Sequence, residues 1–392
     1  MIGVGLDTDR VSGEASRLSA ALEAIDFEGW DPYDALSSTV IRAAARTPLA
    51  RRVAIQSFKR LPINLRRFAG MQPRRQTKAL ALCVSAYTRL ARLPGFHQSQ
   101  ALVDALADDL ARRAVPNGRG VGWAYDFDVQ TRWGFYTAGK PNGVVTAFAI
   151  HALFDASDMP DADPRFDELA KRACRGALET LLVRTPCGQY FGYYQGTRIP
   201  IHNANLLVAS ALARCPEAES DVAEAAKSAV SFTVSHQRPN GSWPYGEGHG
   251  LEWVDGYHTA YNLVSLHRYL ESAKDPAIEA ALDRGLAFYI DHLFEPSGAP
   301  RATDERLYPI DIHGASSAIW ALATLRSRSP DALLLAELVL DWTLAHMQRG
   351  DGRYAFQLHA RHRNSIPYVR WSDAHMLLAL ASLAEARRQD AD

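Results

Sequence analysis

Imidazole and carboxylate side chains recur along this chain at intervals of 55 to 62 residues. The recurring set is His202, Asp255 with His258, Asp311 with His313, and Asp373 with His375. Side chains that follow a structural repeat occupy equivalent places in space, so we expect this set to surround one site. Imidazoles and carboxylates are also the groups with which enzymes most often move protons. The spacing therefore predicts a functional site built from distant parts of the chain.

Several chemistries fit these residue types. The candidate acids and bases are Asp128, Asp255, His258, Asp311 and His313. Two facing carboxylates could hydrolyse a glycosidic bond, with an outcome set by their separation. A histidine or tyrosine beside an arginine could instead remove a proton from a uronic acid, as a lyase or an epimerase does. Asp255, Asp311 and Asp373 could also act only as helix caps. The sequence leaves these alternatives open.

Aromatic side chains accompany the polar ones, in the mixture typical of carbohydrate sites. Flat sugar faces stack on rings, while hydroxyls take polar partners. The loop 123–133 is the densest such patch, and its Arg132 could hold a carboxylate or a phosphate. The aromatic residues of the glycine turns could alternatively only pin helices together. The expected substrate-binding residues are Trp123, Tyr125, Arg132, His202, Asn203, Asn205, Trp243, Tyr245, Tyr257, Tyr308, Arg370, Asp373 and His375. The four cysteines lack zinc-ligand spacing, and we predict no metal and no cofactor.

Helices must position these residues, because helical periodicity dominates the chain. Glycine turns at Gly188, Gly241, Gly298 and Gly352 lie 53, 57 and 54 residues apart and separate successive helix pairs. One helix of each pair is apolar nearly all round, which predicts a buried inner series at 76–92, 141–157, 201–214, 256–273, 312–327 and 370–388. An amphipathic outer series is predicted at 97–115, 163–184, 217–237, 276–293 and 330–348, with 40–60 as a sixth member.

Six inner and six outer helices in alternation predict an all-α fold, a closed (α/α)6 toroid over residues 76–388. In such a barrel the first turns of the inner helices converge at one end, so the polar clusters should line a single funnel. Residues 1–75 are expected to form an N-terminal basic helical extension packed on the toroid.

Charge is unevenly distributed, although the net charge is only −1 and gives no steering toward nucleic acid. Residues 35–103 contain thirteen Lys/Arg and no Asp or Glu. This basic stretch is either a solvated face or, through residues 42–78, a contact with an anionic membrane. Few cysteines, no signal peptide and no long apolar run predict a cytoplasmic protein, with peripheral attachment at the inner membrane as the alternative.

Several motifs resemble those of the bacterial polysaccharide-biosynthesis family typified by VpsJ. They lie at residues 30–36 (WDPYDAL), 62–66 (PINLR), 125–132 (YDFDVQTR), 202–207 (HNANLL), 253–259 (WVDGYHT), 308–313 (YPIDIH) and 368–371 (YVRW). Asp126 and Val129 depart from the family pattern, which has Pro and Trp there. The resemblance implies a toroid encoded with glycosyltransferases of exopolysaccharide or lipopolysaccharide assembly, acting on a glycan or lipid-linked glycan.

A more distant likeness is to the class II isoprenoid cyclases, which share helical toroids and Gln-x₃-Gly-x-Trp turns. Asp311 falls where their acidic motif would open an inner helix, but His313 and Gly314 replace its last two aspartates. The leading hypothesis is therefore a glycan-modifying enzyme of hydrolase, lyase or epimerase type. A cyclase-like enzyme is the alternative, and a non-catalytic glycan-binding scaffold is the third possibility.

Overall fold

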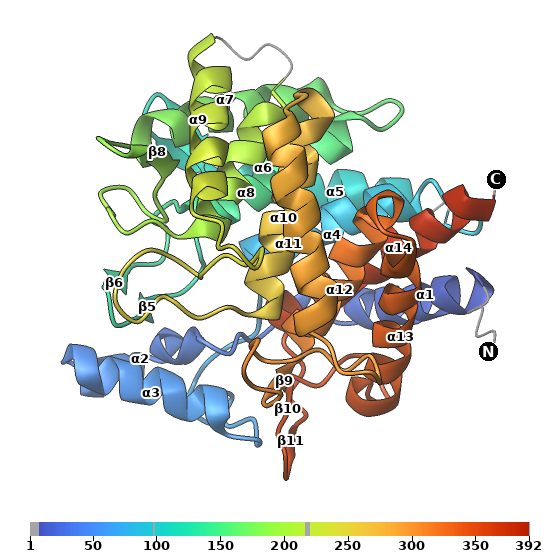
Figure 1. Cartoon of the computed structure of the whole chain (residues 1–392). Helices are drawn as coiled ribbons and strands as arrows, with labels where there is room; N and C mark the ends of the chain where they lie inside the picture. The colour runs from blue at the N-terminus through green and yellow to red at the C-terminus, as the bar shows by residue number, and fades with distance from the viewer. Residues whose placement is uncertain (1–7, 97–98, 216–219, 392) are drawn as a thin grey trace.

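The computed structural model describes residues 8–96, 99–215 and 220–391, and these are mostly helical (Figure 1). Six helices form an inner series, and each contacts the next: α4 (Thr77–Leu90), α6 (Gly143–Ser157), α8 (His202–Ala213), α10 (Gly256–Ser272), α12 (Ile312–Thr324) and α14 (Ala374–Ala391). Contacts between α14 and α4 bring the last helix back to the first. The inner helices predicted from periodicity are confirmed to within about a turn. In α6 every residue up to Ala156 is buried, which explains why its sequence is apolar on all faces.

Each outer helix packs on the inner helix before it. The outer helices are α5 (Ser99–Arg112), α7 (Pro164–Leu181), α9 (Ser220–Ser235), α11 (Pro276–His292) and α13 (Pro330–Met347). Positions 97–98 and 217–219 of the predicted outer helices lie outside the described residues. The structure otherwise confirms this outer series.

The sixth outer position is filled by a different segment from the one predicted. Helix α1 (Thr8–Glu23) packs on α14 through Val11, Ala15, Leu18 and Leu22, which are fully buried. The expectation that residues 40–60 would supply this helix is wrong. That stretch forms α2 (Thr39–Ala44) and α3 (Pro48–Arg60), which pack on the short helix η1 (Asp34–Ser37). The division of the chain at residue 75 stays a prediction.

Short antiparallel strands shape the loops that lead into the inner helices. Four pairs are β1 (Glu28–Gly29) with β2 (Arg74–Arg75), β3 (Val115–Asn117) with β4 (Gly120–Gly122), β5 (Val129–Gln130) with β6 (Phe135–Tyr136), and β7 (Leu182–Thr185) with β8 (Gly188–Phe191). A three-stranded sheet has the order β11 (Arg363–Asn364), β10 (Gln357–Leu358), β9 (Ile310–Asp311), with Gln357 opposite Asp311. A π-helical turn, η3 (Val369–Asp373), precedes α14.

The glycine turns pin one helix pair to the next. Gly241 has φ +91°, and a Cβ there would lie 2.4 Å from the carbonyl oxygen of Arg284, so only glycine fits. Gln237 donates its amide to the carbonyl oxygens of Gly241 (2.9 Å) and of Ala281 in α11 (2.8 Å). The Trp243 indole donates to the carbonyl of Thr233 in α9 (2.9 Å). This turn is therefore architectural.

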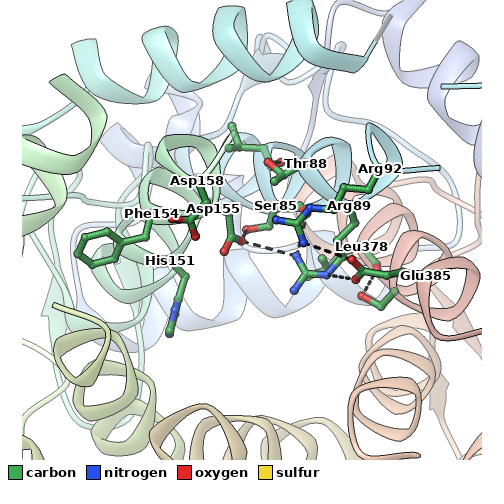
Figure 2. Close-up of polar contacts among 12 residues, drawn as sticks. Ser85, Thr88, Arg89, Arg92, His151, Phe154, Asp155, Asp158, Leu378 and Glu385 are labelled. Carbon is green, nitrogen blue, oxygen red and sulfur yellow. Dashed lines mark hydrogen bonds and ion pairs between the residues drawn. The ribbon is translucent and has the colours of Figure 1, made fainter. Parts of the chain in front are cut away.

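The far ends of the inner helices are tied by a buried ionic cluster, which Figure 2 shows. The Asp155 carboxylate of α6 accepts hydrogen bonds from Ser85 of α4 (2.6 Å) and from Arg214 after α8 (2.6 Å). Arg89 of α4 lies 3.6 Å from Asp155 and 3.5 Å from Glu385 of α14. Burial opposes ionisation of Asp155, but Arg214 and Arg89 outweigh it and hold its pKa below the usual range. Four inner helices thus meet at one carboxylate network.

Candidate functional site

The first turns of the inner helices converge on a cavity of about 260 Å³. The second residue of each inner helix lies there: Lys78, Val144, Asn203, Tyr257 and His313 line the cavity, and His375 touches the Tyr261 hydroxyl behind it. The loops add aromatic walls from Tyr33, Tyr125, Phe127, Tyr193, Tyr245, Trp253 and Trp371. A second cavity of about 380 Å³ shares Tyr125, Trp133, Tyr193 and Tyr245 with the first.

His258 and Asp255 form a hydrogen-bonded pair at the start of α10. One carboxylate oxygen of Asp255 caps the helix by accepting from the His258 backbone N–H (2.8 Å). The other lies 2.8 Å from His258 Nδ1. A carboxylate only accepts, so Nδ1 carries the proton and donates it. The imidazole ring also packs on Tyr257 and Tyr245, at centroid distances of 4.0 and 4.5 Å. The pair uses Nδ1, so Nε2 is the nitrogen that remains on a fixed ring that lines the cavity.

Tyr261 and His313 form a second chain, one turn further along α10. His313 Nδ1 lies 3.0 Å from the carbonyl oxygen of Trp371, so it must be the protonated nitrogen. Burial and the nearby Lys78 hold the pKa of His313 well below its usual value, so the ring is neutral. Its Nε2 then accepts from the Tyr261 hydroxyl at 2.6 Å. Burial raises the pKa of Tyr261 well above its usual value, so the phenol keeps its proton.

Two cations face this end of the cavity. The Lys78 ammonium lies 3.3 Å from the Tyr261 oxygen and 4.5 Å from the Phe148 ring centroid. Burial and the Arg370 charge hold the pKa of Lys78 well below its usual value. Arg370 donates to the buried Asp31 carboxylate (2.5 Å) and packs over the rings of Tyr125 and Trp371. Asp31 fixes this guanidinium, whereas Lys78 forms no ion pair with a carboxylate of the described residues.

Asn203 presents an unpaired acceptor. Its side chain lines the cavity and is buried, and its Oδ1 has no hydrogen-bond partner among the described residues. A buried amide oxygen without a partner carries a desolvation cost that a bound donor would remove. A ligand hydroxyl is such a donor. Asn203 therefore indicates that the cavity is built for a polar molecule.

Asp311 lies behind the cavity wall. One oxygen caps α12 at the His313 N–H (2.9 Å) and accepts from the Trp371 indole (2.8 Å), while the other accepts from Gln357 (2.7 Å). Burial raises the pKa of this carboxyl despite these donors. Asp311 borders a separate cavity of about 170 Å³, together with Lys59. These hydrogen bonds show that Asp311 caps α12 and also orients the Trp371 ring.

The other expected aspartates and arginine lie away from the cavity. Asp128 accepts from the Ala138 N–H (2.8 Å) across the β5–β6 hairpin. Asp373 is fully buried, pairs with Arg353 at 2.8 Å and accepts from the Tyr354 N–H. Arg132 is exposed, whereas its neighbours Thr131 and Trp133 line the cavity. None of the cavity's lining residues, all in the described part of the chain, is an Asp or a Glu.

Several expected binding residues belong to the packing between helices. Trp123 and Trp243 are buried in the core, and the Trp123 indole donates to the carbonyl of Leu110 (2.8 Å). His202 lies between Thr233 (3.1 Å) and Glu247 (2.8 Å). These contacts place the three side chains outside the cavity.

Asn205 and Tyr308 also lie outside the cavity. Asn205 accepts from the Phe191 N–H (2.8 Å) and donates to the carbonyl of Ala229 (2.7 Å), so its amide is fully used in packing. Tyr308 is half exposed and borders a different surface hollow, near Trp342. Neither residue reaches the cavity.

The four histidines of the sequence pattern are not at equivalent positions. His202 is the first residue of its helix, His258 the third, and His313 and His375 the second. One residue turns a side chain by about 100° around a helix, since a turn holds 3.6 residues. His202 therefore points between helices, and His258 and His313 reach the cavity from different angles.

Lys78 and Tyr261 were not expected as site residues. Lys78 could have been found as the second residue of the first inner helix, equivalent to His313. Tyr261 lies four residues after Tyr257, on the same helix face. Among the described residues no group of three or more metal-ligating side chains is placed to hold a metal ion. Within the same residues no helix is long and apolar enough to cross a membrane.

The chain matches no protein-family model and no curated protein in sequence. Its fold resembles a cellobiose 2-epimerase from Bacillus thermoamylovorans, with a TM-score of 0.62 and 10% identity over 80% of this chain and 88% of that one. An unsaturated glucuronyl hydrolase specific for heparin gives a TM-score of 0.62 at 13% identity, over 97% of both chains. A polysaccharide lyase gives 0.55 at 11% identity, over 80% and 91%. The protein thus has the helical fold of these enzymes.

Proposed function

We propose that this protein is a glycan-modifying enzyme that moves a proton at a sugar carbon, as an epimerase or a lyase does. One observation carries the proposal. His258, oriented through Nδ1 by Asp255, lines a cavity together with Lys78, Arg370 and aromatic rings but no carboxylate, and its Nε2 takes no part in the pair with Asp255. The sugar-processing enzymes that share the fold support the substrate class.

His258 is the proposed base. It would remove a proton from a sugar carbon next to a carbonyl or carboxylate group, and the C–H electron pair would move toward that group's oxygen. The Asp255 carboxylate would stabilise the imidazolium that forms, because it accepts a hydrogen bond from the Nδ1–H group. An epimer forms when a second donor returns a proton to the opposite face and the His258 imidazolium later releases its own proton to solvent. An unsaturated sugar forms when a β-substituent leaves with its bonding electrons and takes up the imidazolium proton.

Lys78 and Arg370 are the proposed electrophilic side of the site, and the Tyr261 hydroxyl positions Lys78 by accepting from its ammonium (3.3 Å). Negative charge develops on the substrate oxygen as the proton leaves, and fixed donors in a dry site stabilise it strongly. All three side chains line the cavity. The same cations would oppose a carbocation, which argues against an isoprenoid cyclase.

Hydrolysis by two carboxylates is less well supported. Such a mechanism needs an acid and a nucleophile or base that both face the bond. Both oxygens of Asp255 are occupied by His258, and Asp128 and Asp311 are bonded away from the cavity. No carboxylate pair is therefore in place among the cavity residues.

The polysaccharide-assembly context is part of the proposal. Motifs that resemble the VpsJ-typified family supply Tyr33, Tyr125, His258, His313 and Arg370, and all five residues line the one cavity. The ring of helix contacts supports a closed (α/α)6 toroid around them. We place the enzyme in the cytoplasm, acting on a glycan or lipid-linked glycan.

The test is proton exchange in heavy water. The protein is incubated with reducing oligosaccharides and with uronic-acid oligosaccharides, and deuterium at the sugar carbons is followed by NMR. The wild type should incorporate deuterium, and His258→Gln should lower the rate by about 10²–10⁴. Asp255→Asn should lower the exchange rate less, since the amide oxygen can still cap α10 but stabilises the His258 imidazolium less than a carboxylate does.

A matched control is His346→Gln, on the outer helix α13, where Nδ1 lies 2.7 Å from the carbonyl oxygen of Trp342. It should leave the exchange rate unchanged. Cleavage without deuterium incorporation would point to a hydrolase instead. Full activity of His258→Gln would remove the base from the proposal, and sugar binding without turnover would favour the scaffold.

A further inference from the structure

We propose that residues 39–68, here called the basic arm, dock the protein on an anionic lipid bilayer. The arm contains α2, α3 and the loop after them. Figure 1 shows α2 and α3 at the edge of the molecule, outside the ring of helices and beside β5 and β6. The docking does not depend on the proposed reaction.

The arm exposes an unusual amount of apolar surface. Of thirteen large hydrophobic side chains exposed among the described residues, six lie in these thirty positions: Val40, Leu49, Val53, Ile63, Leu65 and Phe68. Phe68 is 89% exposed and Leu49 is 68% exposed. Clustered apolar side chains on a surface mark a contact with another body.

Helix α3 separates its buried and exposed faces. Ile55 is buried in a small core with Ala35 and Leu36, which fixes the helix on η1. Leu49 and Val53 are four residues apart and share the opposite, exposed face. Arg60 lies seven residues after Val53, on that same face. The outward face of α3 therefore combines apolar and cationic side chains.

The charge of the arm selects an anionic occupant. Residues 35–103 contain no Asp or Glu. Arg42, Arg60 and Arg67 are exposed, and none forms an ion pair with a carboxylate of the described residues. A polyanion such as nucleic acid would satisfy the arginines but would leave Phe68 and Leu49 in water. Lipid headgroups over an acyl interior satisfy both kinds of side chain.

The arm also adjoins the cavity. Lys59 in the last turn of α3 donates to the Tyr33 hydroxyl (2.7 Å), and Tyr33 lines the cavity. Arg51 packs over the Phe135 ring, 4.4 Å from its centroid, next to Trp133 at the cavity's edge. A bilayer under the arm would therefore lie close to the site. Delivery of a lipid-linked glycan from that bilayer rests on the proposed function, whereas the docking itself does not.

Sedimentation of the full chain with vesicles tests the docking. The vesicles contain phosphatidylcholine alone or phosphatidylcholine with phosphatidylglycerol. We expect binding only to the anionic vesicles. The double variant Arg60→Gln with Arg67→Gln should weaken it by about fivefold for each charge. Leu49→Ser with Phe68→Ser should weaken it by about tenfold or more, since both side chains would leave the acyl region.

Two matched variants control for a general loss of charge or apolar surface. Leu334→Ser with Leu338→Ser alters exposed leucines of α13, where Leu334 is 64% exposed. Arg184→Gln with Lys227→Gln removes two exposed cations elsewhere. Both should bind as the wild type does. Equal binding to neutral vesicles, no binding to either kind, or equal losses in arm and control variants would overturn the proposal. The proposal would also be overturned if the wild type sedimented as a dimer and the variant Leu49→Ser with Phe68→Ser sedimented as a monomer.

Discussion

At the scale of single residues, two side chains of the same type can have different roles because their hydrogen-bond partners differ. Asp255 and Asp311 both cap inner helices, yet only Asp255 also holds a histidine that faces the cavity. His313 has both nitrogens occupied, by Trp371 and Tyr261. The Tyr261 hydroxyl donates its one proton to His313 and accepts from Lys78, so it links these two side chains. We infer that His313 is a positioning residue for the Tyr261 hydroxyl.

Tyr261→Phe tests that inference. The change removes the hydroxyl that donates to His313 and accepts from the Lys78 ammonium, the group that would stabilise charge on the substrate oxygen. We expect kcat to fall by about 10²–10³ with little change in KM, because the interaction strengthens only in the transition state.

Steady-state kinetics of the proposed reaction provides the measurement. Tyr269→Phe, two turns along the same helix and outside the cavity, serves as the control and should behave as the wild type. A variant at position 261 that raised KM and left kcat intact would assign the hydroxyl to ground-state binding only.

At the scale of elements, the inner helices meet near both ends. The second residues of five of them line the cavity, and toward the other end α4, α6, α14 and Arg214 after α8 meet in the ionic cluster around Asp155 that Figure 2 shows. The cluster joins α4, α6 and α14 at a distance from the site. The helices are thus held at one end so that their first turns can converge at the other.

Asp155→Asn should destabilise the ring. It removes the charge that compensates the largely buried guanidinium groups of Arg214 and Arg89, and breaking a buried ion pair costs about 3–5 kcal/mol, the upper bound here. Unfolding in urea at neutral pH gives the free-energy change. Asp158→Asn is the matched control, since Asp158 also pairs with Arg214 but its side chain is 62% exposed, and its loss should cost less than about 1 kcal/mol. Similar losses in both variants would contradict this role for the cluster.

At the scale of the whole molecule, stability should depend on pH through buried neutral groups. Burial and neighbouring cations hold the pKa values of His313 and His375 well below the usual value. Below about pH 6.5 these imidazoles take up protons in the unfolded chain but stay neutral in the folded one. The unfolded state then binds more protons, so stability rises with pH and is lost as pH falls below that value.

The measurement is the free energy of unfolding in urea at about pH 7 and at about pH 5. The wild type should be less stable at the lower pH, and His375→Gln should reduce the difference between the two. Asp155 affects the stability of the fold in a different pH range. Its lowered pKa stabilises the fold above about pH 4, the value of an unfolded aspartate, and the stabilisation is lost only below it. A His375→Gln variant with the same pH dependence as the wild type would contradict the neutral histidines.

The sequence alone determined the helices and their alternation, because an apolar period of 3.6 residues is a local property that burial of a helix requires. It also singled out residues that line the cavity, including Tyr125, His258 and Arg370. The sixth outer helix was not predictable, since α1 and α3 are both amphipathic and only packing on α14 separates them.

Tertiary structure decided which polar residues share the site. A shift of one residue in the first turn rotates a side chain by about 100°, so His202 and His258 face different surroundings although both recur with the period. Helix ends cannot be placed that closely from sequence. The partners of Asp255, Asp311 and Tyr261 come from distant loops and helices. Local sequence thus determines the helices, and long-range contacts determine which polar side chains form the site.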